Sequence, residues 1–325
     1  MANLLYFLAD RIPQDLRSLV IKYIQNEGYS YKLCFYSETK EEIIKKIKWS
    51  DVILFAPGRF LDNEILCEAQ HIKLMQLWSS GFDKFNIDGA SKYNIPVANN
   101  GGSNAISVAE HTILLLLATS RKIVEGHQRV VNGMWPGNSH GLDMVMLHEK
   151  KLGIIGLGNI GREVAKRAKS FGMEILYVDP LEPSQDLINT LQLKKCNMDE
   201  LMQTSDFITL HMHLNKETKG IIGKSEIDLM KKNSIIINVS RSQLIDIDYL
   251  YKKLAKKEIL GAGFDVYEFE PTTGFEHYLN LPNVVCTPHT AGSTIDIYKK
   301  ALSNCMKNIR LSLKGIEPNW IVNSK

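Results

Sequence analysis

The sequence lacks long apolar runs, paired cysteines and a strong net charge. No apolar stretch approaches the roughly 18 residues that a transmembrane helix needs, so we expect no membrane contact. The five cysteines, at positions 34, 67, 196, 286 and 305, show no paired spacing, which favours reduced thiols in a cytoplasmic protein over a disulfide framework. No cluster of His and Cys residues has metal-ligand spacing, so we expect no metal site.

The charge balance excludes one further class of partner. The formal net charge is only +3, and the lysine pairs are dispersed along the chain. Dispersed pairs fit solvated helix faces, so we expect no nucleic-acid partner. An apolar content of 44% is ordinary for a globular protein, and 325 residues leave room for two domains. The first ten residues lack a basic lead and are expected to form a strand rather than a signal peptide.

The order of the predicted elements indicates two α/β domains. Short apolar runs alternate with amphipathic helices in residues 1–100, which predicts a smaller, flavodoxin-like domain that binds substrate. A helix near 295–313 is expected to return to it, so that residues 295–325 complete this domain. Residues 101–294 are expected to form a Rossmann-type, doubly wound parallel sheet, with a cleft between the domains. The first domain's predicted strands are 4–7, 31–35, 52–55, 74–78 and 96–98, with helices near 14–26 and 41–48.

A glycine-rich turn follows the apolar run at 152–155. The turn reads Gly156-Leu157-Gly158-Asn159-Ile160-Gly161, and a segment with apolar residues at helical spacing comes next. A lone G-x-G-x-x-G is a weak signal, because glycines in an ordinary turn also match it. Between a strand and a helix, it predicts a dinucleotide site in which the phosphates meet the helix N-terminus. The predicted contacts are Gly156, Gly158, Asn159, Ile160 and Gly161.

An acidic residue stands where the second strand of such a unit ends. The apolar run 174–178 leads directly to Asp179, which lies 18 residues beyond Gly161. This spacing suits a carboxylate that binds the ribose hydroxyls of the adenosine half. A carboxylate also repels a 2′-phosphate, so Asp179 favours NAD over NADP.

Three polar residues follow three later strands at the same predicted edge. Arg241 ends the run 234–240, Glu270 lies in the loop after 261–266, and His289 follows 284–287. An arginine fork pairs with a carboxylate, and a histidine is the usual proton donor at neutral pH. A nearby carboxylate favours the protonated imidazole and orients it. The three side chains therefore predict hydride transfer to a 2-keto acid, with Arg241 as the clamp and His289, paired with Glu270, as acid and base.

Other histidines compete for these roles. His111 falls within a strongly apolar segment and matches no metal pattern, so a core position is expected for it. His211 and His213 lie at a predicted strand end near the cofactor edge, which leaves a ligand contact open for this pair.

Six segments in order resemble the D-isomer-specific 2-hydroxyacid dehydrogenases, an NAD-dependent family. The family assigns its catalytic roles to an Arg, a Glu and a His that fall here on Arg241, Glu270 and His289. The resemblance implies that backbone N–H groups at Ser80 and Gly81 bind the substrate carboxylate. The segments are Ser80–Asp88, Ser107–His111, Lys151–Gly161, Asn238–Arg241, Asp265–Pro271 and Thr287–Gly292. By the same resemblance the cofactor contacts include His211, Ser240, Asp265 and Gly292, and Asp265 contacts the nicotinamide amide.

Some positions depart from the family pattern. Ser242 stands where a Gly commonly follows the catalytic Arg, and His213 stands where Pro is frequent. Related formate dehydrogenases replace the catalytic Glu with Gln, so Glu270 argues against that activity. Residues 56–61 do not match the Arg-Ser-x-Thr segment typical of phosphoglycerate-specific members. Two alternatives stay open: a phosphite-type dehydrogenase, and a non-catalytic NAD(H)-sensing corepressor.

The predicted helix 105–122 is apolar on every face around residues 113–118. Such a helix must be buried on all sides, either as a core helix or, as the family suggests, in a homodimer interface. The partner of the site is a small 2-keto or 2-hydroxy acid whose side chain the sequence does not identify. Aromatic residues near the pocket would favour bulky acids such as phenylpyruvate, and the residues considered for its lining are Arg59, Trp78, Phe82, Trp135, Phe275 and Tyr278.

Overall fold

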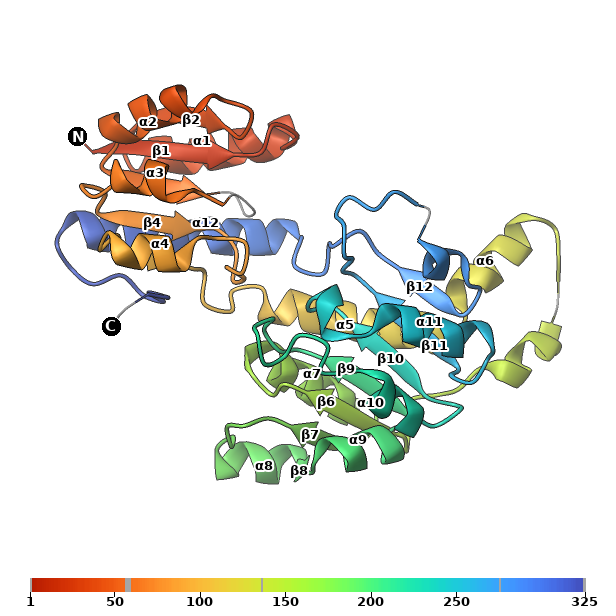
Figure 1. Cartoon of the computed structure of the whole chain (residues 1–325). Coiled ribbons are helices and arrows are strands. Elements are labelled where there is room, and N and C mark those ends of the chain that lie inside the picture. The colour runs from red at the N-terminus through yellow and green to blue at the C-terminus, as the bar shows by residue number, and fades with distance from the viewer. Residues whose placement is uncertain (1, 56–59, 136, 275, 324–325) are drawn as a thin grey trace. The chain divides into compact units, whose positions relative to one another are not determined.

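Two parallel sheets organise the chain in the computed structural model (Figure 1). The structure describes residues 2–55, 60–135, 137–274 and 276–323. The chain divides into two compact units: residues 1–104 together with 294–325, and residues 105–293. No helix of the described residues is long and apolar enough to cross a membrane.

The first unit contains a five-stranded parallel sheet. Its strands are β1 (Asn3–Leu8), β2 (Ser30–Phe35), β3 (Val52–Phe55), β4 (Leu74–Leu77) and β5 (Val97–Ala98). They lie in the order β2-β1-β3-β4-β5, which is the flavodoxin-like order. Its helices are α1 (Gln14–Asn26), α2 (Lys40–Trp49), α3 (Asn63–Cys67), α4 (Ile87–Lys92) and α12 (Ile295–Leu313). Although α12 comes last in the sequence, it packs against β4 and α1.

Strand β1 shows why this sheet is covered on both faces. Its side chains alternate between two apolar clusters, as the two-residue period of a strand requires. Leu4, Tyr6 and Leu8 pack with residues of α1 and α12. Leu5 and Phe7 pack with residues of α2 and α3 on the opposite face. A strand buried on both faces reads as an unbroken apolar run, which is how the sequence predicted it.

The second unit contains a seven-stranded parallel sheet. Its strands are β6 (Lys151–Ile155), β7 (Glu174–Val178), β8 (Lys194–Lys195), β9 (Phe207–Leu210), β10 (Ile235–Asn238), β11 (Gly261–Phe264) and β12 (Val284–Cys286). The order is β12-β11-β10-β9-β6-β7-β8, the doubly wound order of a Rossmann fold. The chain starts at β6, winds outward to β8, and returns to continue from β9. The direction of winding therefore reverses between β6 and β9, which is where such sheets bind ligands.

The helices of the second unit include one that is almost wholly buried. They are α5 (Ala105–Ser120), α6 (Ile123–Val131), α7 (Asn159–Ser170), α8 (Gln185–Leu191), α9 (Met198–Thr204), α10 (Lys224–Leu229) and α11 (Ile247–Ala255), with short 3-10 helices at Gly137–Asp143, Ser242–Leu244 and His277–Asn280. Eleven of the sixteen residues of α5 are buried. This helix packs against α7, β10, β11 and β12, so most of its apolar surface is covered by its own unit.

Most predicted elements are present, and the differences have local causes. The predicted helix 105–122 ends at Ser120, because Lys122 has a left-handed backbone with φ 50° and α6 begins directly after it. The sequence reading did not include α6. In Figure 1, α6 and the segment that follows it (yellow to yellow-green) extend away from the sheet of their unit.

Candidate active site

The predicted site residues of the second unit lie along one edge of its sheet. Because all seven strands are parallel, their carboxyl ends share that edge. From β12 across to β7, the segments that follow each strand carry the predicted residues in an unbroken series. That series is His289 after β12, Asp265 and Glu270 after β11, Ser240 and Arg241 after β10, His211 after β9, the glycine turn after β6 and Asp179 after β7.

The three glycines of the turn have three different surroundings. Gly156 has φ 93°, and a Cβ there would stand 2.9 Å from the carbonyl carbon and oxygen of His211. A Cβ on Gly161 would stand 2.2 Å from the backbone oxygen of Gly156, so only glycine lets α7 begin this close to β6. At Gly158, by contrast, no atom lies within 4 Å of the position that a Cβ would take. The open side of the turn is therefore at the N-terminus of α7, where a pyrophosphate fits.

The side chain of Asp179 is hydrogen-bonded to the glycine turn. Its Oδ2 accepts a 2.6 Å hydrogen bond from the backbone N–H of Leu157, and its Oδ1 accepts one of 2.8 Å from Leu181. The carboxylate that is predicted to bind the ribose is thus fixed beside the turn that is predicted to bind the phosphates. Substituting Asp179 would loosen the turn as well as remove a charge.

His211 directly follows β9 and is buried, and its backbone lies against Gly156 of the glycine turn. Its backbone N–H donates to Ile155, and neither ring nitrogen has a hydrogen-bond partner among the residues that the structure describes. Burial lowers the pKa of this imidazole to about 3, so the ring is neutral at working pH. A buried imidazole without partners is uncommon and favours a site completed by a ligand.

Arg241 is presented by a turn that Asn238 shapes. The buried Asn238 side chain donates to the carbonyl of Arg241 and accepts from the backbone N–H of Ser240. The Ser240 hydroxyl donates to Leu210 on the neighbouring strand, which ties the turn to β9. Nη1 of Arg241 donates to the Ser240 carbonyl at 2.7 Å. Ser242, which departs from the family pattern, has a buried hydroxyl without a hydrogen-bond partner in the described part of the chain.

His289 and Glu270 form a hydrogen-bonded pair. The Nδ1 of His289 lies 2.8 Å from Oε2 of Glu270, and the imidazole is 45% exposed. A carboxylate only accepts, so Nδ1 carries the proton in this contact and Nε2 is left for another partner. The second oxygen of Glu270 accepts from the backbone N–H of Tyr267. The side chain of Tyr267 then bonds the carbonyl of Thr287, so it links the Glu270 loop to the His289 loop.

Asp265 is fully buried and holds the turn that carries His289. Its Oδ1 accepts from the Thr287 hydroxyl at 2.6 Å and from the N–H of Thr290 at 2.9 Å. Its Oδ2 accepts from the N–H of Ala291 at 2.8 Å. The nicotinamide contact that the family resemblance gave this residue stays a prediction, while the structure shows that Asp265 anchors the turn that carries His289. Gly292 follows directly at the end of this turn.

His111 lies in the apolar helix α5, as its sequence context indicated, and its largely buried imidazole contacts the same network. Its Nε2 lies 2.8 Å from Oγ1 of Thr287 and 3.6 Å from Oδ1 of Asp265. The sequence reading missed this contact, because nothing in the spacing of residues 111 and 287 indicates that α5 lies over the end of β12. The available signals were that His111 is polar within a largely apolar helix and that it belongs to the family-like segment Ser107–His111.

Ser80 and Gly81 belong to the first unit and follow β4. The Ser80 hydroxyl donates to Asn104, its carbonyl accepts from the Asn99 side chain, and the Gly81 carbonyl accepts from Ser79. Of the residues considered for the substrate pocket, Trp78 and Tyr278 pack edge-on against Tyr298 and Phe264, while Trp135 is 83% exposed. Arg59 and Phe275 lie outside the described residues. Aromatic lining of the pocket therefore stays a prediction.

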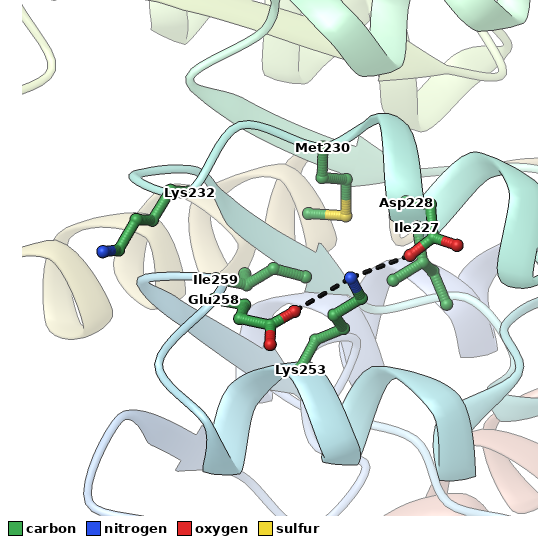
Figure 2. Close-up of a pocket in the computed structure, with 7 residues that line it drawn as sticks. All are labelled: Ile227, Asp228, Met230, Lys232, Lys253, Glu258 and Ile259. Carbon is green, nitrogen blue, oxygen red and sulfur yellow. Dashed lines mark ion pairs between the residues drawn. The ribbon is translucent and has the colours of Figure 1, made fainter.

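A surface pocket elsewhere in the second unit does not serve this chemistry (Figure 2). Lys253 on α11 lies at its centre and pairs with Asp228 at 2.8 Å and Glu258 at 2.9 Å. These hydrogen bonds raise the pKa of Lys253, so the ammonium stays charged. The lining residues Met230 and Ile259 precede β10 and β11, so the pocket opens at the amino ends of the strands. Ligands of such sheets bind at the carboxyl ends.

The fold and the turn define a Rossmann-type protein with a dinucleotide site, and sequence comparison gives its family. Residues 113–291 match the NAD binding domain of the D-isomer specific 2-hydroxyacid dehydrogenases. The chain belongs to this family, which confirms the resemblance and the expectation of NAD as cofactor. No cluster of three or more His, Cys, Asp or Glu side chains able to hold a metal occurs among the described residues.

Relatives differ in their named substrates. The chain is 32% identical over 326 residues to glyoxylate reductase of Thermococcus litoralis, with 98% of this chain and 96% of that enzyme covered. It is 37% identical over 286 residues to D-3-phosphoglycerate dehydrogenase of Methanocaldococcus jannaschii, with 88% of this chain covered but only 54% of the relative, so it spans about half the length of that protein. An acyclic imino acid reductase in complex with NADPH and D-Arg has a TM-score of 0.86 at 25% identity, covering 98% of this chain and 99% of the other.

The glycine turn generates a paired prediction. Gly161→Ala should destabilise the fold by about 2 kcal/mol or more, because its Cβ meets backbone that cannot move aside. Gly158→Ala should cost about 1 kcal/mol or less, since its Cβ meets open space, yet weaken NADH binding roughly tenfold. Urea unfolding and NADH fluorescence titration measure the two effects. If folded Gly158→Ala binds NADH with unaltered affinity, the pyrophosphate does not bind at this turn.

The burial of His211 generates a prediction about pH. The folded-state pKa lies below that of an unfolded histidine, about 6.5, so the unfolded chain binds the proton more readily. Stability is therefore full above pH 6.5 and is lost as the pH falls toward 3. His211→Gln should reduce the loss of unfolding free energy between pH 7 and pH 5 by about 2 kcal/mol. The exposed His148→Gln is the control, and equal pH profiles for the wild type and His211→Gln would contradict the assignment.

Proposed function

We propose that the protein is an NAD-dependent dehydrogenase that interconverts a 2-keto acid and a D-2-hydroxy acid. The observation that carries the proposal is the 2.8 Å pair of His289 and Glu270, which lies on the same sheet edge as Arg241 and the glycine turn. A proton donor, a carboxylate-binding cation and a dinucleotide turn are the parts that this reaction needs. Family membership supports the class of reaction.

Arg241 binds the substrate carboxylate in this proposal. Its guanidinium is charged at any working pH and presents two parallel N–H donors, which match the two oxygens of a carboxylate. The turn built on Asn238 holds the Arg241 backbone at the carboxyl end of β10. The neighbouring strand β11 leads to Glu270, so the clamp and the acid–base pair come from adjacent strands. The contribution of the Ser80 and Gly81 N–H groups stays a prediction from the family resemblance.

His289 moves the proton. When bound, NADH supplies a hydride to C2 of the keto acid, and the ketone oxygen then needs one proton to become a hydroxyl. Nδ1 of His289 is engaged with Glu270, so Nε2 is the nitrogen that donates this proton in reduction and accepts it in oxidation. Glu270 orients the ring and balances the charge of the imidazolium. Hydride and proton together account for the two hydrogens gained by the keto acid.

The residues that would hold NAD fit the molecule. Gly158 leaves open space at the N-terminus of α7, Asp179 offers a carboxylate at the end of β7, and His211 has two buried ring nitrogens without a described partner. Ser240, Asp265 and Gly292 complete the set at the nicotinamide side, as the family resemblance implies. Asp179 is proposed as the selector against a 2′-phosphate. Asp179→Ala should reduce the preference for NADH over NADPH. An unchanged preference would show that Asp179 does not select against the 2′-phosphate.

The experiment that tests the proposed function is oxidation of NADH, and separately NADPH, across a panel of 2-keto acids. Glyoxylate comes first, because the Thermococcus litoralis relative that the chain matches over nearly its whole length is named for it. Pyruvate, hydroxypyruvate and phenylpyruvate vary the side chain. We expect NADH-linked turnover of at least one acid, and a KM for it that rises about tenfold or more in Arg241→Lys, which keeps the charge but loses the fork.

Tight NADH binding without turnover of any acid would contradict the proposal. A phosphite-type dehydrogenase and an NAD(H)-sensing corepressor would then be the remaining candidates, and turnover of phosphite separates them. If Arg241→Lys has the KM of the wild type, the substrate carboxylate is not bound by Arg241.

We further propose that the protein forms a homodimer through α5 and α6. Although α5 is mostly covered by its own unit, Leu114 on α5 is 53% exposed. Apolar side chains on α6 are exposed as well, namely Ile123, Val124, Val130 and Val131. Ile123 and Val130 are seven residues apart, as are Val124 and Val131, so each pair shares a face of the helix, and exposed apolar faces indicate a protein interface. Sedimentation velocity should give twice the 36.8 kDa chain mass for the wild type and the chain mass itself for Val131→Lys. A monomeric wild type would contradict the dimer.

A further inference from the structure

Two side chains of α5, four residues apart, bond the two ends of the turn that carries His289. The Ser107 hydroxyl donates to the carbonyl of Ala291 at 2.7 Å, and Nε2 of His111 lies 2.8 Å from the hydroxyl of Thr287. Residues four apart share one face of a helix, so both bonds come from the same face of α5. The helix packs against β12, directly before the turn. The turn formed by residues 287–291 is therefore held by two side chains of α5.

The direction of each hydrogen bond follows from the chemistry of the groups. The Thr287 hydroxyl has one proton, and it donates that proton to the Asp265 carboxylate at 2.6 Å. The hydroxyl must then accept from His111, so Nε2 of His111 carries a proton. A chain of bonds results, from His111 through Thr287 to Asp265. Because Asp265 also accepts from Thr290 and Ala291, the chain joins both ends of the turn.

The turn needs this support because of its backbone. His289 has φ 53°, in the left-handed region that a residue with a Cβ adopts at a cost of about 1 kcal/mol or more. Its N–H donates to the carbonyl of Thr287 at 3.0 Å, which closes a tight loop. Such a conformation persists only where the surroundings specify it in several ways. Asp265, Tyr267 and α5 supply those contacts here.

We propose that His111 is a positioning residue for His289, acting through Thr287, with Ser107 holding the other end of the turn. By donating to the Thr287 hydroxyl, His111 fixes the proton of that hydroxyl toward Asp265, so the turn has a single conformation and His289 meets Glu270. The inference rests on the proposed function, since it treats His289 as the proton donor. It gives a role to two polar residues, Ser107 and His111, in the first two turns of a largely apolar helix.

Kinetics of four variants test the proposal. His111→Leu removes the donor and should lower kcat about tenfold, while the NADH dissociation constant stays within about twofold. His111→Gln keeps an N–H donor and should recover most of kcat. Thr287→Val should match His111→Leu, and the double variant should be no slower than the slower single one, because both break one chain of bonds. Thr112→Val is the matched control, since the hydroxyl of this buried neighbour donates to Val108 of its own helix and has no other hydrogen bond among the described residues.

Several results would overturn the positioning role. Wild-type kcat in His111→Leu would do so, as would equal losses in His111→Gln and His111→Leu, which indicate packing rather than a donor. Additive losses in the double variant would show that His111 does not act through Thr287. A loss of the same size in Thr112→Val would show that any disturbance of α5 has this effect.

Histidine NMR separates this inference from the proposed function. With nitrogen-labelled histidine, His111 should appear as the Nε2-protonated ring, and His111→Leu should shift or broaden the ring signals of His289, identified by their loss in His289→Asn. Thr112→Val should leave them in place. If the wild type turns over no keto acid, the proposed function fails. The NMR signals still test whether His111 positions His289 through Thr287. Unchanged His289 signals in His111→Leu would overturn the inference in either case.

Discussion

The buried carboxylate of Asp265 is the interaction on which the site depends. A charge without access to water is tolerated only when hydrogen bonds compensate it, and Asp265 receives them from a hydroxyl and two backbone N–H groups. All three donors belong to the five residues from Thr287 to Ala291. The cost of burying the charge is therefore offset by a single turn, and that turn must adopt the shape that points its donors inward. His289 lies at the centre of it, in a left-handed conformation that the bonds on either side specify.

The parallel sheet explains why the remaining groups lie near that turn. Each strand of the second unit ends at the same edge, and the strand order places the ends of β12, β11 and β10 next to each other. The proton donor, its carboxylate partner and the arginine thus come from three neighbouring strands. The glycine turn lies where the winding of the sheet reverses, and Asp179 bonds it from the next strand. The strand order brings side chains that are distant in sequence to one edge of the sheet. Hydrogen bonds between side chains and nearby backbone groups then set their orientation.

Much of this arrangement could be predicted from the sequence. Buried parallel strands are unbroken apolar runs, so the strand ends that lead to Gly156, Arg241, Glu270 and His289, and their position at one edge, follow from the pattern. Contacts that depend on packing could not be predicted. The sequence does not show that α5 covers the end of β12, so the contact of His111 with Thr287 could not be predicted. Asp179 was predicted to face a ribose, but its bond to Leu157 depends on the bend of the turn. Helix α6 was not predicted. It begins directly after Lys122, whose left-handed backbone ends α5 and which the sequence does not mark as a break.

The central claim is that His289, held by Glu270 and by the turn on Asp265, donates the proton that completes hydride transfer. The most direct measurement is a single-turnover, stopped-flow record of NADH oxidation by the wild type and by His289→Ala, with NADH saturating and the best keto acid of the panel. The account predicts that the rate falls about 100-fold or more, as expected for loss of a general acid, while the NADH dissociation constant stays the same. A wild-type rate in His289→Ala would contradict it.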